Sequence, residues 1–273
     1  MAQHGLFEGG GARIPGDMAA EHLSACIIAM DEADRIGACI ESLSFCDEVI
    51  VVDSHSSDAT REVAVSLGAR VIERDWEGFT KQKQFAVEAA THDWVLCLDA
   101  DERVSPELEV ELRALKESGF AGPGYTMPRL TQWEGMWIRR GTWYPDRQLR
   151  VFDRRRGSWQ GGAVHEKVVL DGPTAELTGD LLHESYRDLD EHLGTIGKYT
   201  KLGAENLATK GRRASFTDLW VRPLVRFLRF YVLGRGFLLG WRGLSLALLG
   251  AHYVHLKYLR RMIDQEREGP RNG

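Results

Sequence analysis

The sequence predicts an α/β fold in which a mostly parallel sheet is covered on both faces by helices. Two observations lead to this fold class. Between His22 and Leu98, short apolar runs alternate with stretches of helical periodicity. Successive apolar runs are also far enough apart for right-handed crossover helices. With 273 residues and 43% hydrophobic content, the chain is long enough to bury a sizeable core.

The elements of this first half follow one another as strand and helix. Apolar runs predict strands at residues 23–30, 48–53, 69–75 and 93–99. Amphipathic stretches predict helices at residues 33–46, 57–67 and 79–92. The second of these helices starts at Ser57 and Asp58, both favoured N-cap residues. Strands joined by such helices are buried on both faces.

Beyond Gly119 the pattern breaks up into Gly, Trp, Arg and Pro. Short strand-like pieces recur at residues 124–130, 147–153 and 165–170. This second half is therefore predicted to be mixed and loop-rich, and suited to shaping a pocket.

Residues 215–273 have a different character and predict a basic amphipathic helical region. Three arginines share one helical face, and four apolar residues occupy the opposite face: Arg222, Arg226 and Arg229 against Leu224, Phe227, Leu228 and Tyr231. The apolar stretch between residues 242 and 257 is shorter than the roughly 20 residues of a spanning helix. Aromatics beside arginines are typical of a helix lying in a lipid headgroup layer. Packing on the rest of the protein, with the arginines in water, is the alternative.

Composition excludes some classes of function. The net charge of −5 leaves no global basic surface for nucleic acid. The four cysteines lie in apolar segments without C-x-x-C spacing, as expected of reduced, buried residues in a cytoplasmic protein. Residues 1–21 contain no apolar stretch of the signal-peptide type and are expected to be a disordered leader.

Acidic residues follow three of the predicted strands, at Glu32, at Asp53, and at Asp99 with Asp101. Ligands of such sheets bind at the carboxyl ends of the strands, so we expect these acids on one rim. Residues two apart in an extended segment point the same way, which aims Asp99 and Asp101 at one point. Such a pair suits Mg²⁺ or Mn²⁺ carrying nucleotide phosphates. The alternative is a solvated turn whose acids cap the next helix.

Several ordered motifs carry a family resemblance. They are IIAMDEADRIGACIESL, VIVVDSHSSDAT, KQKQFAVEAA and LCLDADE, all between Leu23 and Leu108. This stretch resembles family 2 glycosyltransferases of the GT-A fold. The later segments GTWYPDRQLRVFDRR, VHEKV and LLHESY narrow the likeness to bacterial lipopolysaccharide core β-glucosyltransferases. The resemblance extends to about Arg261.

The resemblance implies three regions. Residues 22–214 would form a GT-A catalytic domain with a nucleotide-binding half (22–118) and an acceptor-side half (119–214), and residues 215–273 would lie near a membrane. It implies inverting transfer of a sugar, glucose in the first instance, from a UDP-linked donor to a lipid-linked saccharide acceptor in lipopolysaccharide or other envelope glycan assembly. The enzyme would be peripheral on the cytoplasmic face of the inner membrane.

Donor-side roles follow from the same resemblance. Asp53 would hydrogen-bond the base, and Glu32 would lie beside the nucleotide. Lys83 would neutralise the diphosphate as a point charge, without the bidentate fork of an arginine. Asp99 would contact the ribose or the metal shell, and Asp101 would ligate Mg²⁺ or Mn²⁺ directly.

On the acceptor side, Glu166 in VHEKV is the leading candidate for the base that takes the hydroxyl proton. Asp146 in YPDRQLR is the second candidate. Arg147 and Arg150, in a segment rich in aromatic residues, are expected to bind an anionic acceptor together with His165. Ordinary packing of the aromatic residues under a loop is the alternative.

Three interpretations stay open beside these roles. His183 is interpreted as structural, since a single histidine usually is. A nucleotidyltransferase would share the acidic sheet edge, but the Gly-rich segment at residues 9–13 precedes the first strand instead of following it. The other alternative is a noncatalytic protein that docks on membranes and retains a transferase fold.

Overall fold

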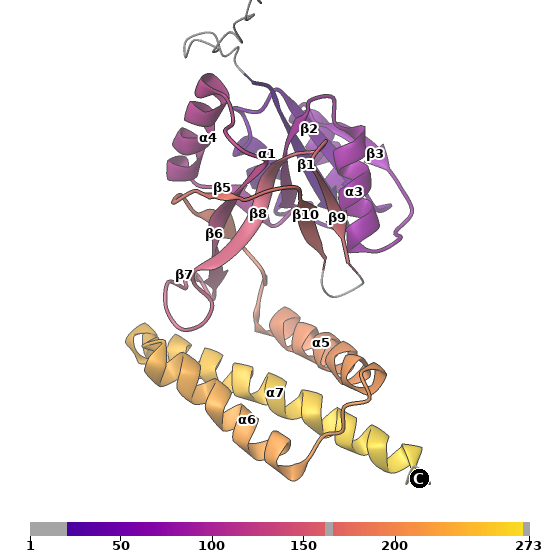
Figure 1. Cartoon of the computed structure of the whole chain (residues 1–273), viewed down its shortest axis with the longest axis vertical. Helices are drawn as coiled ribbons and strands as arrows, with labels where there is room; N and C mark the ends of the chain where they lie inside the picture. The colour runs from indigo at the N-terminus through magenta and orange to yellow at the C-terminus, as the bar shows by residue number, and fades with distance from the viewer. Residues whose placement is uncertain (1–20, 162–165, 270–273) are drawn as a thin grey trace, which may run out of the picture.

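The computed structural model describes residues 21–161 and 166–269 of the 273-residue chain. Figure 1 shows an α/β body with a separate layer of helices beneath it. Residues 1–20 of the predicted leader, and His165 of the predicted acceptor site, lie outside the described residues. Glu21 donates its backbone N–H to the carbonyl of Lys116 at 2.9 Å.

The main sheet has the strand order β3-β2-β1-β4-β8-β6-β12-β5, with β7 and β11 paired to β6. Its strands in chain order are β1 (Leu23–Ala29), β2 (Glu48–Asp53), β3 (Arg70–Glu73), β4 (Trp94–Asp99), β5 (Glu102–Val104), β6 (Gly124–Trp133), β7 (Met136–Trp137), β8 (Asp146–Asp153), β11 (Ala175–Glu176) and β12 (Leu181–His183). A separate hairpin pairs β9 (Gly157–Gln160) with β10 (Lys167–Leu170).

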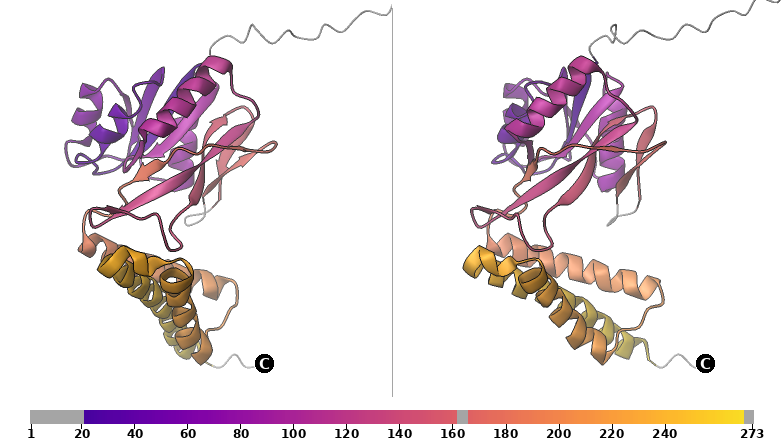
Figure 2. Two further views of the ribbon diagram at one scale, coloured as in Figure 1. Left: turned by 90° about the vertical axis from the view of Figure 1, so that its left-hand side faces the viewer. Right: turned by 60° about the vertical axis from the view of Figure 1, so that its left-hand side comes forward.

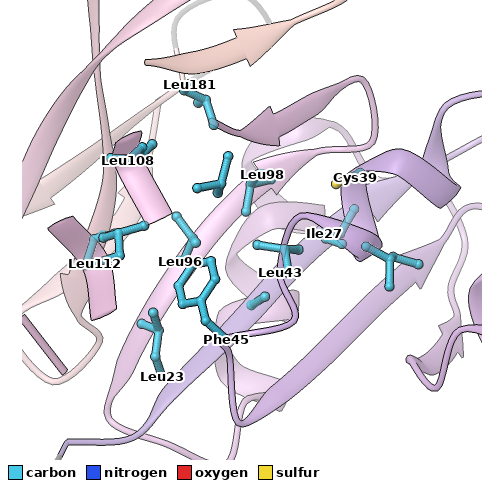
Figure 3. Packing of buried hydrophobic residues seen from close by; sticks show 14 of the residues in the cluster. Leu23, Ile27, Cys39, Leu43, Phe45, Leu96, Leu98, Leu108, Leu112 and Leu181 are labelled. Atoms are coloured by element: carbon cyan, nitrogen blue, oxygen red, sulfur yellow. The ribbon is translucent and has the colours of Figure 1, made fainter. Parts of the chain in front are cut away.

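Strands β3, β2, β1 and β4 are parallel, and the mixed part of the sheet begins where β8 pairs antiparallel with β4. This arrangement confirms the predicted fold class. Apolar side chains of β1 and β4, such as Leu23 and Leu96, pack against Leu43 and Phe45 on one face (Figure 3). A second buried cluster, which includes Val87, covers the opposite face.

The helices of the body are α1 (Ile36–Glu41), α2 (Thr60–Ser66), α3 (Phe79–Ala89) and α4 (Pro106–Ser118). The remaining helices form what we call the helical layer: α5 (Leu189–Thr209), α6 (Phe216–Leu228), the π-helical turn η1 (Arg229–Leu233), the 3₁₀ turn η2 (Gly236–Leu239) and α7 (Gly240–Glu268). Figure 2 shows this layer below the sheet from two further directions.

Two body helices are shorter than predicted. Helix α1 ends at Glu41, because the chain then turns to bring Leu43 and Phe45 into the core. Helix α2 begins at Thr60 with Ala59 at the N-cap position, later than predicted. Of the two predicted cap residues, Asp58 accepts from the N–H of Thr60 at 3.0 Å and also from the N–H of Ala33, whereas Ser57 donates to Asp31 in the loop after β1.

The helical layer starts at Leu189, earlier in the chain than the predicted start at residue 215, because α5 packs beside α7. The apolar stretch at residues 242–257 lies within the 29-residue helix α7. Among the described residues, no single helix has the length and hydropathy to span a membrane. The bent pair 216–233 and 236–268 meets the criterion only when its two parts are taken together, across a bend of 72°.

Hydrogen bonds and ion pairs attach the helical layer to the body, and two of them are close to the cavity-forming loops. Arg187, just before α5, donates to Asp34 at 2.8 Å and to Glu32 at 3.1 Å, both in the loop after β1. The N–H of Gly141, in the loop between β7 and β8, donates to the carbonyl of Gly234 at 2.9 Å. A Cβ on Gly234 would lie 2.6 Å from the Cα of Gly141, so this close approach of two backbones requires glycine.

Candidate active site

A cavity of about 1050 Å³ lies between the carboxyl edge of the parallel strands and the helical layer. Open α/β sheets bind ligands at this edge, and the volume is that of a small-molecule site. Five of the predicted site residues line it together: Glu32, Lys83, Asp99, Asp101 and Glu166. Its opposite wall comes from α5, α6 and α7.

Asp99 ends β4 and is held by two cations. Its carboxylate lies 2.9 Å from Lys83 Nζ and 3.1 Å from Arg150 Nη2. Burial by itself would raise the pKa of Asp99, but the positive charges of Lys83 and Arg150 outweigh it and hold that pKa well below its usual range. Asp99 is therefore an ionised carboxylate fixed within an ion-pair network.

Asp101 has different partners, because Ala100 and Asp101 form a turn where extended strand was predicted. Asp101 Oδ2 lies 3.3 Å from His183 Nε2, and Nδ1 of the same ring lies 3.3 Å from Thr131 Oγ1. Asp101 Oδ1 is buried and has no hydrogen-bond partner among the described residues. One carboxylate oxygen is thus left for a ligand that the polypeptide does not supply.

The sheet topology explains this pairing. Strand β12 lies between β6 and β5, with His183 opposite both Thr131 and Glu102. Since Asp101 directly precedes β5, the histidine reaches it from a segment about 80 residues further along the chain. His183, which the sequence pattern led us to interpret as structural, therefore belongs to the site.

The pair Asp101 and His183 is compatible with a divalent cation. Within residues 21–161 and 166–269, no three His, Cys, Asp or Glu side chains are close enough to form a metal cage. Mg²⁺, however, is usually bound by one or two protein ligands together with substrate phosphates and water. The unpartnered Asp101 Oδ1 and the adjacent imidazole Nε2 supply the chemistry of such a partial site.

Lys83 and Glu166 meet on the side of the cavity formed by α3 and β10. Glu166 Oε1 lies 3.7 Å from Lys83 Nζ. The lysine side chain is only 6% exposed, and its ammonium lies 4.9 Å from the centre of the Trp159 ring. Packing of the lysine stem thus holds its charge between the carboxylates of Asp99 and Glu166.

Glu32 and Asp53 lie at the same sheet edge in different environments. Glu32 accepts from Arg35 Nε at 2.6 Å, and burial raises its pKa despite the opposing charge of Arg35. Asp53 is fully buried below the turn that follows β2, where it accepts from the N–H of Ser56 at 2.9 Å. It is not among the side chains that line the cavity.

Three predicted residues of the acceptor half lie outside the cavity lining. Arg150 is 4% exposed and donates to Glu102 at 2.6 Å, so its guanidinium is occupied inside the body. Arg147 is 3.0 Å from Glu176. Asp146 accepts from Arg129 Nη2 at 2.6 Å.

We expect Glu102→Ala to reduce the free energy of unfolding by about 3 kcal/mol, because it leaves the buried guanidinium of Arg150 with only Asp99 as a counter-ion. Urea denaturation would measure the loss. Glu109→Ala is the matched control, since it breaks an exposed pair with Arg113 and should change the free energy by less than about 0.5 kcal/mol. Equal losses in the two variants would contradict the assignment.

Residues 24–169 match the family model described as glycosyl transferase family 2. The chain belongs to glycosyltransferase family 2. The matched segment contains the body strands from β1 to β10 and, within them, the acidic sheet edge.

Similar proteins extend the likeness beyond the matched segment. This family 2 glycosyltransferase is 33% identical over 241 residues to the lipopolysaccharide core biosynthesis glycosyltransferase LpsC of Rhizobium meliloti, covering 86% of this chain and 89% of the relative. It is 29% identical to the uncharacterized glycosyltransferase RT0209 of Rickettsia typhi, over 88% and 87% of the two chains. Because each match covers 86% or more of this chain, it extends into the helical layer.

A solved structure shares the fold. The mannosyltransferase PcManGT of Pyrobaculum calidifontis, in complex with GDP-Man and Mn²⁺, superimposes with a TM-score of 0.53 over 92% of this chain and 90% of its own, at 14% identity. The resemblance to family 2 glycosyltransferases of the GT-A fold, drawn from the sequence motifs, is thereby confirmed.

Proposed function

We propose that this family 2 glycosyltransferase transfers a sugar, glucose in the first instance, from a UDP-linked donor to a saccharide acceptor of lipopolysaccharide or another envelope glycan, with inversion at the anomeric carbon. The observation that carries the proposal is the meeting of Asp101, His183 and Lys83 around one cavity at the sheet edge. The 33% identity to LpsC supports the class of acceptor. PcManGT, which has a similar fold, binds GDP-Man with Mn²⁺.

The residues divide the chemistry between them. Lys83 offsets part of the diphosphate charge, while Asp99 fixes the lysine and faces the ribose or the metal shell. Glu166 takes the proton of the acceptor hydroxyl as it attacks the anomeric carbon from the side opposite the diphosphate. Asp53 is buried outside the cavity lining and accepts from Ser56, so the base contact assigned to it would require the turn after β2 to open.

A divalent cation, Mg²⁺ or Mn²⁺, would be held by Asp101 and His183, with Asp99 in its outer environment. When bound, it supplies charge stabilisation for the departing nucleoside diphosphate. Thr131 holds the other ring nitrogen of His183, which orients Nε2 toward the same point.

The test is to incubate the purified protein with UDP-, GDP- and ADP-sugars and Mn²⁺ or Mg²⁺, and to follow release of the nucleoside diphosphate. We expect turnover with a UDP-sugar, and loss of turnover when EDTA removes the metal. Turnover of another nucleotide sugar alone would correct the donor. Absence of both binding and turnover for every donor would overturn the proposal.

We also propose that the helical layer rests on the cytoplasmic face of the inner membrane and presents a lipid-linked acceptor to the cavity. Several apolar side chains of helix α6 face outward although other apolar residues of the helix are packed. Three of its apolar side chains are well exposed: Trp220 (57%), Leu224 (57%) and Leu228 (42%). Arg226, on the opposite face, lines the cavity. From residue 219 to 263 the chain has eight Lys or Arg and no Asp or Glu. Exposed apolar side chains can enter the bilayer, and an excess of positive charge attracts anionic lipid headgroups, so this surface suits an anionic bilayer.

We expect the protein to sediment with phosphatidylglycerol vesicles and less with phosphatidylcholine vesicles, with binding weakened at high salt. Leu224→Glu with Leu228→Glu should lower vesicle affinity about tenfold or more, because two apolar anchors are lost. Val110→Glu on α4 is the matched control, because Val110 is 68% exposed but lies on the body. Equal losses from both surfaces would contradict the proposed orientation.

A further inference from the structure

The cavity has five basic side chains, and they differ in whether an acidic partner neutralises them. Arg35 pairs with Glu32, Lys83 with Asp99, and Arg129 with Glu102 and Asp146. The other two, Lys198 on α5 and Arg226 on α6, also line the cavity. Neither of them has an acidic partner among the described residues.

Arg226 is the more enclosed of these two cations. It is half-buried, and its Nη1 donates to Thr142 Oγ1 at 2.8 Å. That neutral hydroxyl is the single hydrogen-bond partner of Arg226 among the described residues, although a guanidinium carries five N–H donors. A Cβ on Gly250 of α7 would lie 3.4 Å from Arg226 Nε, so the helix wall fits closely around the guanidinium.

The charge of Arg226 is also poorly compensated. Burial, together with the positive charge of Arg229, lowers the pKa of Arg226 below its ordinary value. A buried cation without a counter-ion is unfavourable, and an anion that binds beside it removes that penalty. Phosphate and carboxylate groups fit the planar fork of arginine in a bidentate manner.

Arg226 lies on the wall opposite the donor residues. Asp99, Asp101 and Lys83 belong to the sheet edge and α3, whereas Arg226 belongs to the helical layer. Tyr199 of α5 lines the same cavity. Burial raises the pKa of Tyr199, and the negative charges of Glu166 and Asp99 contribute to the same shift.

We infer that Arg226 forms an oxyanion subsite that binds a phosphate or carboxylate group carried by the acceptor saccharide. This inference rests on the proposed function and adds the class of acceptor, an anionic glycan. Arg147 and Arg150, the arginines to which the sequence assigned this role, have carboxylate partners of their own in Glu176 and Glu102. The bilayer is the other source of the same oxyanion, through its headgroup phosphates.

The test uses a deacylated, water-soluble lipopolysaccharide core oligosaccharide in two forms, native and dephosphorylated with its carboxyl groups reduced. Without vesicles, Arg226→Gln should raise the KM for the native form about tenfold with little change in kcat, and should change the KM for the neutralised form by less than about twofold. Arg226→Lys should restore part of the loss. Arg222→Gln, on the same helix but paired with Asp218 and outside the cavity lining, is the matched control.

Three results would overturn the inference. An equal KM change for both forms would mean that Arg226 does not bind the anion. Weaker UDP binding by Arg226→Gln in calorimetry would place the arginine in the donor site. Loss of phosphatidylglycerol vesicle binding in Arg226→Gln, with the soluble acceptor unaffected, would assign the oxyanion to a lipid headgroup. Donor turnover by the wild-type protein is measured in the same series. Absence of that turnover would mean that the proposed function fails, and it is distinguishable from the three results above.

Discussion

Asp101→Ala should abolish metal-dependent binding of the donor and lower kcat/KM by roughly 10³-fold or more, since charge stabilisation at the leaving group contributes several kcal/mol. The physical reason is the geometry around this carboxylate. Its Oδ1 is buried without a partner among the described residues, and its Oδ2 lies beside His183. Calorimetry of UDP binding with and without Mn²⁺ measures the effect directly.

His183→Ala should reproduce the loss of Mn²⁺ dependence, because it removes the second proposed ligand. Asp93→Ala is the matched control. It removes a carboxylate just before the amino end of β4, where Asp93 pairs with Arg155, and should leave UDP binding unchanged. If Mn²⁺ strengthened UDP binding to Asp101→Ala as much as to the wild type, the assignment of the metal site would be wrong.

Glu166→Gln should retain donor binding and lower kcat by about 10²- to 10⁴-fold, the range for removal of a general base. The amide preserves the shape of the side chain but cannot accept the hydroxyl proton. Lys83, 3.7 Å from the carboxylate, should remain in place because Asp99 still binds it. Single-turnover transfer from UDP-glucose, with UDP binding measured in parallel, separates the two effects.

Glu166→Asp should recover part of the activity, since a carboxylate is retained. Asp146→Asn tests the second candidate base. Asp146 accepts from Arg129 and lies outside the cavity lining, so we expect its replacement to lower kcat less than Glu166→Gln does. Full activity of Glu166→Gln together with an inactive Asp146→Asn would transfer the role to Asp146.

The sequence pattern was sufficient for the parallel strands of the body, β1 to β4. The strand predicted at residues 48–53 coincides with β2, because apolar periodicity and burial are local properties that a short window contains. The rim of acids at Glu32, Asp99 and Asp101 also follows from local pattern, since parallel strands align their carboxyl ends at one edge.

Features of the site that depend on distant pairing could not be predicted in this way. His183 reaches Asp101 only because β12 inserts between β6 and β5. Arg150 is occupied by Glu102, 48 positions away in sequence. For Arg226, the helical periodicity identified a shared face with Arg222 and Arg229, but periodicity does not state which face of a helix is turned inward.

The two faces of the helical layer have a further consequence for the substrate. Leu224 and Leu248 are exposed on one side of α6 and α7, while Arg226 and Tyr253 face the cavity on the other. A helix with its side chains is about 10 Å thick. On the proposed membrane orientation, the layer acts as a spacer between lipid and catalyst. If the layer holds that orientation, a sugar joined directly to the lipid would be too short to reach Glu166, and the proposal predicts a preference for glycans that have already grown by a few residues.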